Sequence, residues 1–391
     1  MSIDFDTVIE RRGTNSLKFD FAAERGRPAD VLPLWVADMD FRAPQAVIDA
    51  LQSAVAHGIF GYSEIKGEYY EAVSGWFRER FGWQTQPEWL VKTPGVVYAL
   101  AMAVRALTKE GDTVLLQPPV YYPFYSVVRD NGRIVAECPL HRVDGTYRFD
   151  PEELETVIVQ KKVRLMLLCS PHNPVGRVWT KQELQEIGRI CEKYHVYVVS
   201  DEIHCDFAFP EHPHTIFMQA NPQLVDQVII CTAPSKTFNL AGLQISNIWI
   251  PGESVRRSFC REIDRSGYSQ LNGLGLVACE AAYREGGEWL EECRLYLRSN
   301  LDMVRTFLRE RLPEIQLVEP EETYFAWLDC SGLGMNRGEL EDFLLNCAKL
   351  WLDGGSMFGS DSWMYQRMVL ACPRRTLTQA LTQLERAIRN K

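Results

Sequence analysis

The sequence predicts an α/β fold with a large domain, built on a mostly parallel mixed sheet, and a smaller α+β domain. Nearly continuous apolar runs at 163–171 (VRLMLLCSP) and 196–204 (VYVVSDEIH) suit strands that are buried on both faces of a sheet. The segment between them, TKQELQEIGRICEKYH, has the apolar spacing of a helix, and Thr180 with Glu183 forms a capping box at its start. Strand, helix and strand in this order form a βαβ unit, which requires parallel strands.

The rest of the first part of the chain alternates helices and strands in the same way. Apolar residues at helical spacing predict helices over 44–58 and 68–82, and a third helix that starts after Gly95 and ends at Gly111. Short apolar runs bounded by turn residues predict strands in DTVLLQPPV, RIVAECPL, DQVIICTAPSK and QISNIWIPG.

After about residue 272 the pattern changes to long helices with few strands. Two helices are predicted on either side of Gly286-Gly287, followed by a strand over 323–332 and helices over 337–350 and 374–390. The predicted units are an N-terminal segment that joins the small domain (1–44), a large cofactor-binding domain (45–285) and a C-terminal small α+β domain (286–391). No flexible linker separates them, so a cleft between the domains is the expected ligand site.

The composition is that of an ordinary globular protein and argues against several function classes. The net charge of −10 argues against nucleic acid, whose binders present a basic face. No apolar run approaches the roughly 18 residues of a membrane span, and the N-terminus lacks the apolar core of a secretory signal. We therefore expect a cytoplasmic protein with no membrane partner.

The eleven cysteines are scattered singly, without a Cys-x-x-Cys pair. This distribution favours buried, reduced thiols over a disulfide framework or a zinc site. His212 and His214 are spaced like a fragment of a metal site, but no third ligand accompanies them, so no metal is expected.

Polar residues follow the apolar strands at their carboxyl ends. Asn173 follows LMLLCS, Asp201 follows VYVVS, and Lys236 follows VIICTA. Gly95 opens a helix whose free N–H groups suit a phosphate. In a doubly wound sheet, ligands bind beyond these strand ends. A lysine for a Schiff base, an acid for a pyridine nitrogen and an anion site are the requirements of pyridoxal 5′-phosphate (PLP).

Three motifs in this order resemble the fold-type I PLP-dependent enzymes of the aspartate aminotransferase superfamily. They are Asn173-Pro174-x-Gly176, Asp201-Glu202 and Ser235-Lys236-Thr237-Phe238. Four further stretches, LWVADMDF (34–41), FGY (60–62), DEIH (201–204) and TAPSKTFN (232–239), are similar to the narrower cystathionine β-lyase/cystalysin branch of MalY/PatB-type C–S lyases. The resemblance covers nearly the whole chain and implies a PLP-dependent carbon–sulfur lyase.

One departure from the aminotransferase pattern supports the narrower branch. Aminotransferases of this class carry Gly-Leu-Arg after the lysine, with the arginine on the cofactor phosphate, whereas this chain has Gly242-Leu243-Gln244. Loss of a charge-assisted contact requires that the phosphate be held in another way. The elimination branch also lacks this arginine.

The resemblance implies a role for each residue near the cofactor ring. Lys236 would carry the cofactor and then move the Cα proton, Asp201 would pair with the pyridine nitrogen, and Asn173 would bind the ring O3′. Tyr121 would stack on the ring and Tyr122 would protonate the leaving thiolate. For both tyrosines, a place in the core or in an interface is the alternative.

The phosphate, by the same resemblance, would be held by backbone N–H groups of Gly95 and Val96 and by Ser235. Tyr62 resembles the tyrosine that reaches the neighbouring subunit's phosphate and substrate, which implies a homodimer with shared active sites. Packing of Tyr62 within its own subunit is the alternative. His204 would lie near O3′ or have a packing role.

The substrate carboxylate would be clamped by Arg367 and by the backbone N–H of Ala37. Arg374 and Arg375 compete for this role but fit the first turn of the last helix. The family pattern Phe-x-Arg-x-Asn reads Tyr365-Gln366-Arg367-Met368-Val369 here, without the asparagine.

Three functions are compatible with these residues. The first is α,β-elimination from a sulfur amino acid such as cystathionine or cysteine, which gives pyruvate, ammonia and a thiol. The second is an aminotransferase that uses the same residues. The third is a regulatory PLP-binding protein that acts by contact with a partner. No residue distinguishes one sulfur amino acid from another.

Overall fold

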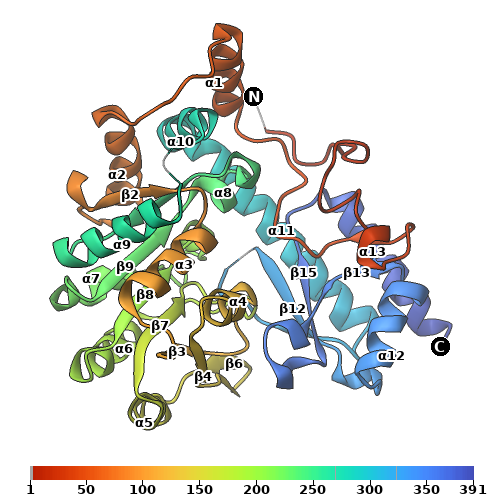
Figure 1. Ribbon diagram of the computed structural model, residues 1–391. Coiled ribbons are helices and arrows are strands. Elements are labelled where there is room, and N and C mark those ends of the chain that lie inside the picture. Colours follow the sequence, from red (N-terminus) through yellow and green to blue (C-terminus); the bar gives the residue numbers. More distant parts are fainter. Residues whose placement is uncertain (1–2, 269, 323) are drawn as a thin grey trace.

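The protein is built around a seven-stranded sheet (Figure 1). The computed structural model describes residues 3–268, 270–322 and 324–391. In spatial order the strands are β2 (Leu90–Thr93), β10 (Ser246–Trp249), β9 (Val228–Thr232), β8 (Tyr197–Asp201), β7 (Val163–Cys169), β3 (Thr113–Leu116) and β4 (Ile134–Glu137). Strand β10 is antiparallel to both of its neighbours and the other pairs are parallel, so the sheet is mixed and mostly parallel as predicted.

Helices cover both faces of this sheet, because alternate strand residues are apolar on both sides. Leu165 and Leu167 of β7 belong to one buried cluster, and Met166 and Leu168 belong to the other. The first cluster includes α3 (Val96–Leu107), α4 (Pro123–Arg129) and α9 (Glu253–Arg265). The second includes α2 (Gly67–Phe81), α5 (Pro151–Lys161), α6 (Lys181–Lys193), α7 (Phe217–Ala220) and α10 (Gly273–Glu285). Helix α1 (Gln45–His57) packs on α10 at the edge of the molecule (Figure 1).

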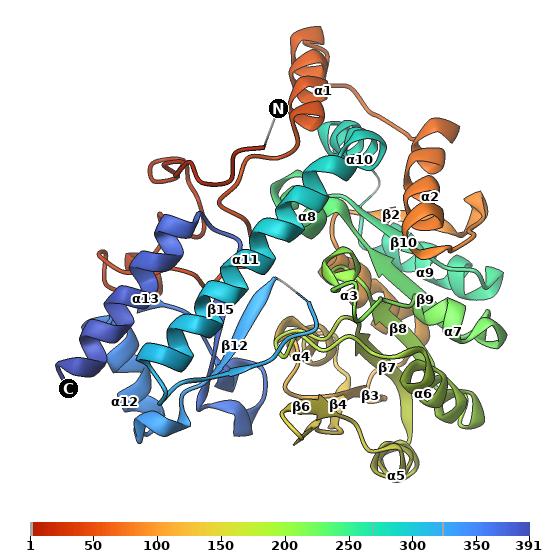
Figure 2. The ribbon, with the colours of Figure 1, turned by 180° about the vertical axis from the view of Figure 1, so that it is seen from behind.

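A second, antiparallel sheet is formed by the C-terminal part of the chain. Its order is β11 (Gln316–Val318), β12 (Phe325–Asp329), β15 (Tyr365–Val369) and β14 (Asp353–Gly354). The long helix α11 (Gly287–Arg311) and the last helix α13 (Arg374–Arg389) lie side by side across it (Figure 2). A separate two-stranded ribbon joins β5 (His141–Val143) to β6 (Thr146–Arg148).

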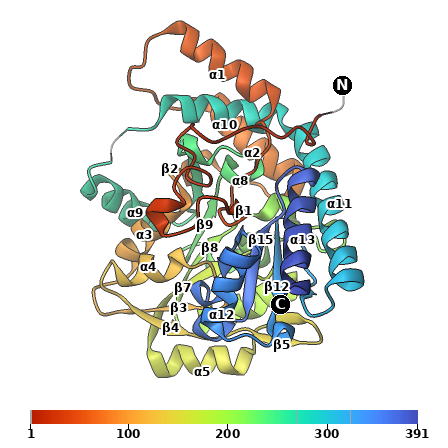
Figure 3. The same ribbon diagram turned by 90° about the vertical axis from the view of Figure 1, so that its right-hand side faces the viewer.

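A short parallel pairing ties the N-terminal segment to the C-terminal part of the chain. Figure 3 shows β1 on the side of the molecule where the C-terminal elements, drawn in blue, lie. Strand β1 (Leu32–Pro33) pairs with β13 (Leu350–Trp351). The rings of Trp35 and Trp351 stack beside this pairing with their centroids 4.4 Å apart. The segment that carries the WVADMD stretch is therefore held against residues more than 300 positions away in the sequence.

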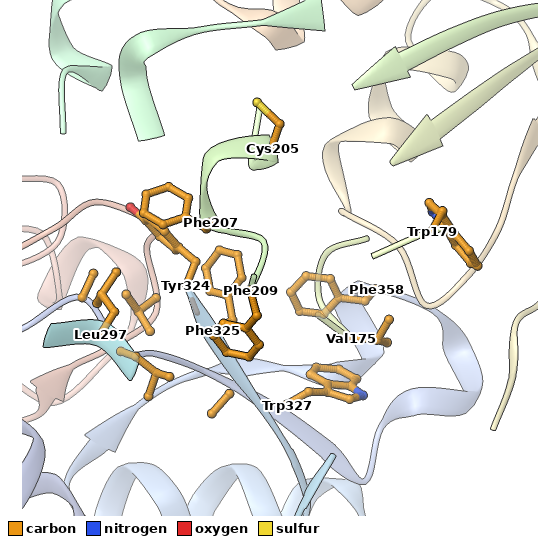
Figure 4. Close-up of a cluster of buried hydrophobic side chains, with 14 of the residues drawn as sticks. Val175, Trp179, Cys205, Phe207, Phe209, Leu297, Tyr324, Phe325, Trp327 and Phe358 are labelled. Carbon is orange, nitrogen blue, oxygen red and sulfur yellow. The ribbon is translucent and has the colours of Figure 1, made fainter. Parts of the chain in front are cut away.

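Aromatic side chains fill the junction between the two sheets (Figure 4). The ring of Tyr324 lies 4.9 Å from that of Phe207, which follows β8, and Trp327 of β12 lies 5.5 Å from Phe358. Each fully buried ring contributes about 1.5–3 kcal/mol of apolar burial. This packing fixes β12, and with it the neighbouring β15, against the carboxyl ends of the central strands.

Most predicted elements lie where the sequence placed them, including the capping box of α6, where Thr180 Oγ1 accepts a hydrogen bond from Glu183 N at 3.2 Å. The predicted helix over 337–350 is wrong beyond Asp342. Helix α12 (Arg337–Asp342) continues into one π-helical turn (Phe343–Cys347), and Leu350 already belongs to β13. The apolar residues that suggested a longer helix are instead buried by β1 and α13.

The predicted strand over 323–332 is β12, with Thr323 outside the described residues. The strands of the seven-stranded sheet lie between residues 90 and 249, and those of the C-terminal antiparallel sheet lie between residues 316 and 369. The domain limits at 44/45 and 285/286 remain predictions. No helix in the described ranges has both the length and the apolar character needed to cross a membrane.

Candidate active site

A cavity of about 440 Å³ lies beyond the carboxyl ends of β7, β8 and β9, beside the N-terminus of α3. The structure brings most of the predicted site residues into its wall, and these are Ala37, Gly95, Val96, Tyr121, Asn173, Asp201, His204, Ser235 and Lys236. Tyr122, Arg367 and Tyr62 are not part of the wall. Ligands of open α/β sheets bind in this position because the strand ends deliver their following residues to one edge.

Lys236 lies in the short helix α8 (Pro234–Thr237), directly after β9. Its Nζ donates a hydrogen bond to the backbone oxygen of Ala37 at 2.6 Å. The pKa of Lys236 is lowered to about 8, chiefly by desolvation; Asp38 opposes this shift, Arg367 adds to it, and Asp201 opposes it. A lysine with this pKa has an appreciable neutral fraction near neutral pH, as a nucleophile requires.

The residue after the lysine is anchored by a buried carboxylate. Thr237 Oγ1 donates to Asp206 Oδ2 at 2.8 Å. The other oxygen of Asp206 accepts from Trp76 Nε1 at 3.0 Å and from Arg80 Nε at 3.1 Å. Asp206 therefore connects α8 to α2, on the face of the sheet that α2 covers.

Asn239 ties the lysine loop to the N-terminal segment. Its backbone has φ of 58°, a left-handed conformation that asparagine tolerates better than most residues. Its side chain accepts from Met39 N at 3.0 Å and donates to the backbone oxygens of Met39 and Phe41. The WVADMD stretch is thereby held beside Lys236.

Asp201 is a buried carboxyl group with spare hydrogen-bonding capacity. Its Oδ1 accepts from Ile203 N at 3.2 Å, and no described residue bonds to Oδ2. Burial raises the pKa of Asp201 to about 7, against the effects of the Ile203 hydrogen bond and of Lys236, while Glu202 adds to the rise. A protonated ring nitrogen in the cavity would favour the ionised form of this carboxyl. Asp201 therefore fits the pyridine end of PLP.

The opposite requirement, an anion site, is met by the N-terminus of α3. Gly95 is the N-cap residue, and no side chain caps the helix, so the first-turn N–H groups, including that of Val96, are available to a ligand. Ser235 and Gln244 line the same cavity. Phosphate held here would be bound by backbone N–H groups and neutral side chains, as the sequence predicted from Gln244.

Arg367 of β15 is almost completely buried, with 2% of its surface exposed. Its Nη1 donates to Asn173 Oδ1 at 2.8 Å and its Nη2 donates to the backbone oxygen of Trp35 at 3.1 Å. The same guanidinium forms an ion pair with Asp353. Its Nε is buried without a partner among the described residues. Asn173 keeps its amide N–H₂ group for a ligand, because its oxygen accepts from the arginine.

Asp353 is a site residue that no sequence pattern indicated. It lies on the two-residue strand β14 and faces Arg367 across the β14–β15 pairing. Burial raises the pKa of Asp353, and Arg367 opposes the rise. A substrate carboxylate at Arg367 would share the guanidinium with this partner, so the predicted clamp is weaker than that of an unpaired arginine.

The two tyrosines differ in position. Tyr121 lines the cavity, and burial raises its pKa. Tyr122 lies behind it, with its ring 5.5 Å from that of Tyr121 and 5.9 Å from that of Phe358. Burial, and secondarily Asp353, raises the pKa of Tyr122. The phenol is therefore protonated at neutral pH, which is the state needed to donate a proton.

His204 is a buried residue of the cavity wall and packs against aromatic rings, 5.2 Å from both Tyr324 and Phe325. Desolvation holds its pKa below the usual range, so the ring is neutral. Its Nδ1 is buried without a described partner. Both predicted roles, near O3′ or in packing, are compatible with this position.

Tyr62 is 91% exposed, so the alternative that it packs within its own subunit is wrong. It lies with Ile59 and Phe60 in the segment between α1 and α2, and these residues line a separate cavity of about 950 Å³ that also includes the start of α10. This surface contains large apolar side chains, since Ile59 and Phe60 are 73% and 69% exposed.

The cysteines and the HPH pair lie apart from the candidate active site, except for Cys169 in its wall. Most of the thiols are buried, and none is in a disulfide within the described ranges. His214 Nε2 lies 2.8 Å from Glu202 Oε2, and Glu202 Oε1 accepts a hydrogen bond from the backbone N–H of Phe217. No cluster of possible metal ligands occurs in the described part of the chain.

Comparison with known proteins identifies the family. The model for aminotransferase class I and II matches residues 29–384. The chain belongs to the aminotransferase class I and II family. The chain is 42% identical to cystathionine β-lyase PatB of Bacillus subtilis, and the match covers 99% of this chain and 100% of the relative. It is 33% identical to protein MalY of Escherichia coli, with 99% of each chain covered.

Comparison with solved structures supports the same family assignment. Cystalysin from Treponema denticola, described as containing a pyridoxal 5′-phosphate cofactor, superimposes with a TM-score of 0.96 at 38% identity over 100% of both chains. The PLP-bound C–S lyase from Staphylococcus hominis superimposes with a TM-score of 0.93 at 31% sequence identity, and the match covers 99% of this chain and 98% of that chain. The predicted fold-type I architecture and the resemblance to the cystathionine β-lyase/cystalysin branch are confirmed.

Proposed function

We propose that this protein is a PLP-dependent carbon–sulfur β-lyase that acts on sulfur amino acids. The observation that carries the proposal is the meeting of Lys236, Asp201, Asn173 and the uncapped N-terminus of α3 in one cavity. The names of the similar proteins support the same reaction. Gln244 in the cavity wall supports elimination over transamination, because aminotransferases of this class keep an arginine there.

One set of residues would bind and orient the cofactor, and another would bind the substrate. When bound, PLP supplies an electron sink that makes the Cα–H bond of an amino acid acidic. Lys236 would hold the cofactor covalently through its neutral amine and would afterwards carry the Cα proton. Asp201 would keep a positive charge on the ring nitrogen, and Asn173 would donate to the ring oxygen. Tyr121 would pack on the ring face.

The substrate would be oriented by the second sheet and the N-terminal segment. The unpartnered Nε of Arg367 and the backbone N–H of Ala37 would hold the carboxylate. The protonated phenol of Tyr122 would donate its proton to the sulfur as the Cβ–S bond breaks. His204 would limit water access by packing beside the ring.

We infer that the active unit is a homodimer. The exposed apolar segment around Tyr62 supports this, because a contiguous apolar surface of this kind marks an interaction site. Tyr62 would reach the phosphate and the substrate in the partner's cavity. Mixing Tyr62→Ala and Lys236→Ala proteins tests this sharing. Hybrid dimers should recover activity, since one of their two sites has both residues intact. No recovery despite demonstrated subunit exchange would contradict it.

Turnover distinguishes the lyase from an aminotransferase. Purified protein is mixed with L-cystathionine in the absence of a keto acid, and pyruvate and thiol are measured over many catalytic cycles. Sustained release supports the lyase. A single burst that resumes only after addition of a keto acid would identify an aminotransferase. No pyruvate from any sulfur amino acid would leave the regulatory function as the better explanation.

A further inference from the structure

The backbone oxygen of Ala37 accepts hydrogen bonds from two separate parts of the chain. Lys236 Nζ donates to it at 2.6 Å, and the phenol of Tyr324 donates to it at 3.3 Å. A carbonyl oxygen has two lone pairs, so it accommodates both donors at once. Lys236 follows β9 of the central sheet, whereas Tyr324 directly precedes β12 of the second sheet. The oxygen of Ala37 therefore connects the lysine to the second sheet.

Tyr324 is completely buried and packs on aromatic side chains. Its ring lies 4.8 Å from that of Phe325 and 4.9 Å from that of Phe207, and Figure 4 shows these rings together. Burial, and secondarily Asp38, holds the pKa of Tyr324 above its ordinary value, so the phenol keeps its proton and acts as a donor. Tyr324 lies outside the described wall of the active-site cavity, so it acts on a ligand only through Ala37.

The residues on either side of Ala37 are anchored without help from Tyr324. The N–H of Asp38 donates to the backbone oxygen of Val36 at 2.9 Å, which closes a tight turn centred on Ala37. Arg11 binds both carboxylate oxygens of Asp38, at 3.0 and 2.6 Å. The freedom left to the Ala37 oxygen is a rotation of the peptide unit that Ala37 shares with Asp38, and the hydrogen bond from Tyr324 opposes this rotation.

The orientation of this oxygen matters for the proton that Lys236 is proposed to move. In that step, Nζ forms an N–H bond with the proton as the Cα–H bond breaks, and the electron pair passes into the electron sink that the bound cofactor supplies. Proton transfer is efficient only while the two groups are held in the right geometry. The Ala37 oxygen is the acceptor that holds the free amine of Lys236 in the cavity wall.

We propose that Tyr324 is a positioning residue for this proton transfer. Its phenol orients the Ala37 oxygen, and that oxygen holds Nζ of Lys236 in place before and after each transfer. The inference rests on the proposed function only in that Lys236 carries the Cα proton. It does not depend on how the bond between carbon and sulfur is broken.

Tyr324→Phe tests the role, because it removes the phenol oxygen and keeps the aromatic ring. In the holoenzyme, NMR follows exchange of the α-proton of L-alanine with D₂O. Alanine has no leaving group at Cβ, so this exchange reports proton transfer alone. At saturating L-alanine the exchange rate should fall about fivefold, as expected for loss of one neutral hydrogen bond, while the half-saturating concentration stays within about twofold.

Tyr69→Phe is the matched control and should exchange the α-proton at the wild-type rate. Tyr69 is another buried tyrosine, and its phenol donates to Asn247 Oδ1 at 2.8 Å, outside the described wall of the cavity. A general effect of losing one buried phenol would therefore appear in both variants.

A second measurement needs no cofactor. Amide hydrogen exchange of the peptide 34–41 in the cofactor-free protein reports how firmly the turn at Ala37 is held. The N–H of Asp38, which closes this turn, should exchange about fivefold faster in Tyr324→Phe than in the wild type or in Tyr69→Phe.

The outcomes separate the positioning role from the lyase. A wild-type rate of α-proton exchange in Tyr324→Phe would overturn the role, as would unchanged amide exchange. A rise in the half-saturating concentration alone would also overturn it, by assigning Tyr324 to substrate binding. If the wild type exchanges the α-proton but releases no pyruvate from any sulfur amino acid, the lyase is refuted and the positioning role stands. If the wild type exchanges no α-proton, the role of Lys236 is refuted together with that of Tyr324.

Discussion

The two ends of the candidate active site are built in different ways. At the cofactor end, Asp201 is the last residue of β8, Lys236 follows the adjacent β9, and Gly95 begins a helix packed on the same sheet. At the substrate end, Arg367 comes from the second sheet and is held by Trp35 of the N-terminal segment together with Asp353 of a two-residue strand.

Substitutions at the two ends should therefore have different effects. The register of the parallel strands sets the backbone positions from which the cofactor residues extend, so a substitution there should chiefly remove a chemical group or a charge. Contacts between separate segments position the substrate residues, so a substitution there also changes affinity and stability. Four predictions test this contrast, from the largest expected effect to the smallest.

Lys236→Ala should have the largest effect, because it removes both the covalent attachment of the cofactor and the group that moves the Cα proton. A general acid–base group alone contributes about 10²–10⁴-fold to the rate, so pyruvate release should fall below detection. Borohydride should no longer label a lysine. Lys92→Ala is the control, since Lys92 belongs to the same sheet but pairs with Glu64 away from the cavity. A labelled lysine in the Lys236 variant would contradict the assignment.

Asp201→Asn should alter the pH dependence of stability in the cofactor-free protein. The folded pKa of Asp201 is raised to about 7 from an ordinary value of 3.8, so the folded state binds its proton more tightly than the unfolded state. Its contribution is therefore fully present below pH 4 and is lost as the pH rises toward 7, by up to about 4 kcal/mol.

Urea unfolding at pH 4 and at pH 7 measures this contribution. The free energy of unfolding should fall less between the two pH values in Asp201→Asn than in the wild type. Saturation with PLP should make the pH dependence of stability more similar in wild type and variant, because a cationic ring nitrogen favours the ionised carboxyl of Asp201. Equal pH dependence of wild type and variant without cofactor would show that burial does not raise this pKa.

Asp353→Asn should affect stability and affinity in opposite directions. Removing one partner of a buried ion pair leaves a buried guanidinium, which destabilises the fold by about 3 kcal/mol. The same change frees Arg367 for a substrate carboxylate, so KM for S-methyl-L-cysteine should fall. Asp329→Asn is the control, since Asp329 pairs with Arg142 outside the wall of the candidate active site. A raised KM with intact stability would show that Asp353 itself contacts the substrate.

The same contrast explains how far the sequence predicted the site. Lys236, Asp201 and Asn173 were predictable, because apolar strands are recognisable and the residues after them must meet at one sheet edge. Asp353 was not, because it lies on a strand of two residues with no hydrophobic pattern and meets Arg367 only through tertiary packing. The end of helix 337–350 was missed for the same reason, since burial by β1 and α13 overrides helical periodicity.

Thr237→Val should have the smallest effect, because Thr237 acts only by positioning its neighbour Lys236. The substitution removes one hydrogen bond to Asp206, whose other oxygen keeps its bonds to Trp76 and Arg80. Such a bond contributes about 1 kcal/mol, so kcat should fall by less than about tenfold while KM stays unchanged. Thr237→Ser keeps the hydroxyl and should restore the wild-type rate. If instead KM rises and the serine variant does not recover, Thr237 contributes through packing and the cofactor end is less rigid than its strand register implies.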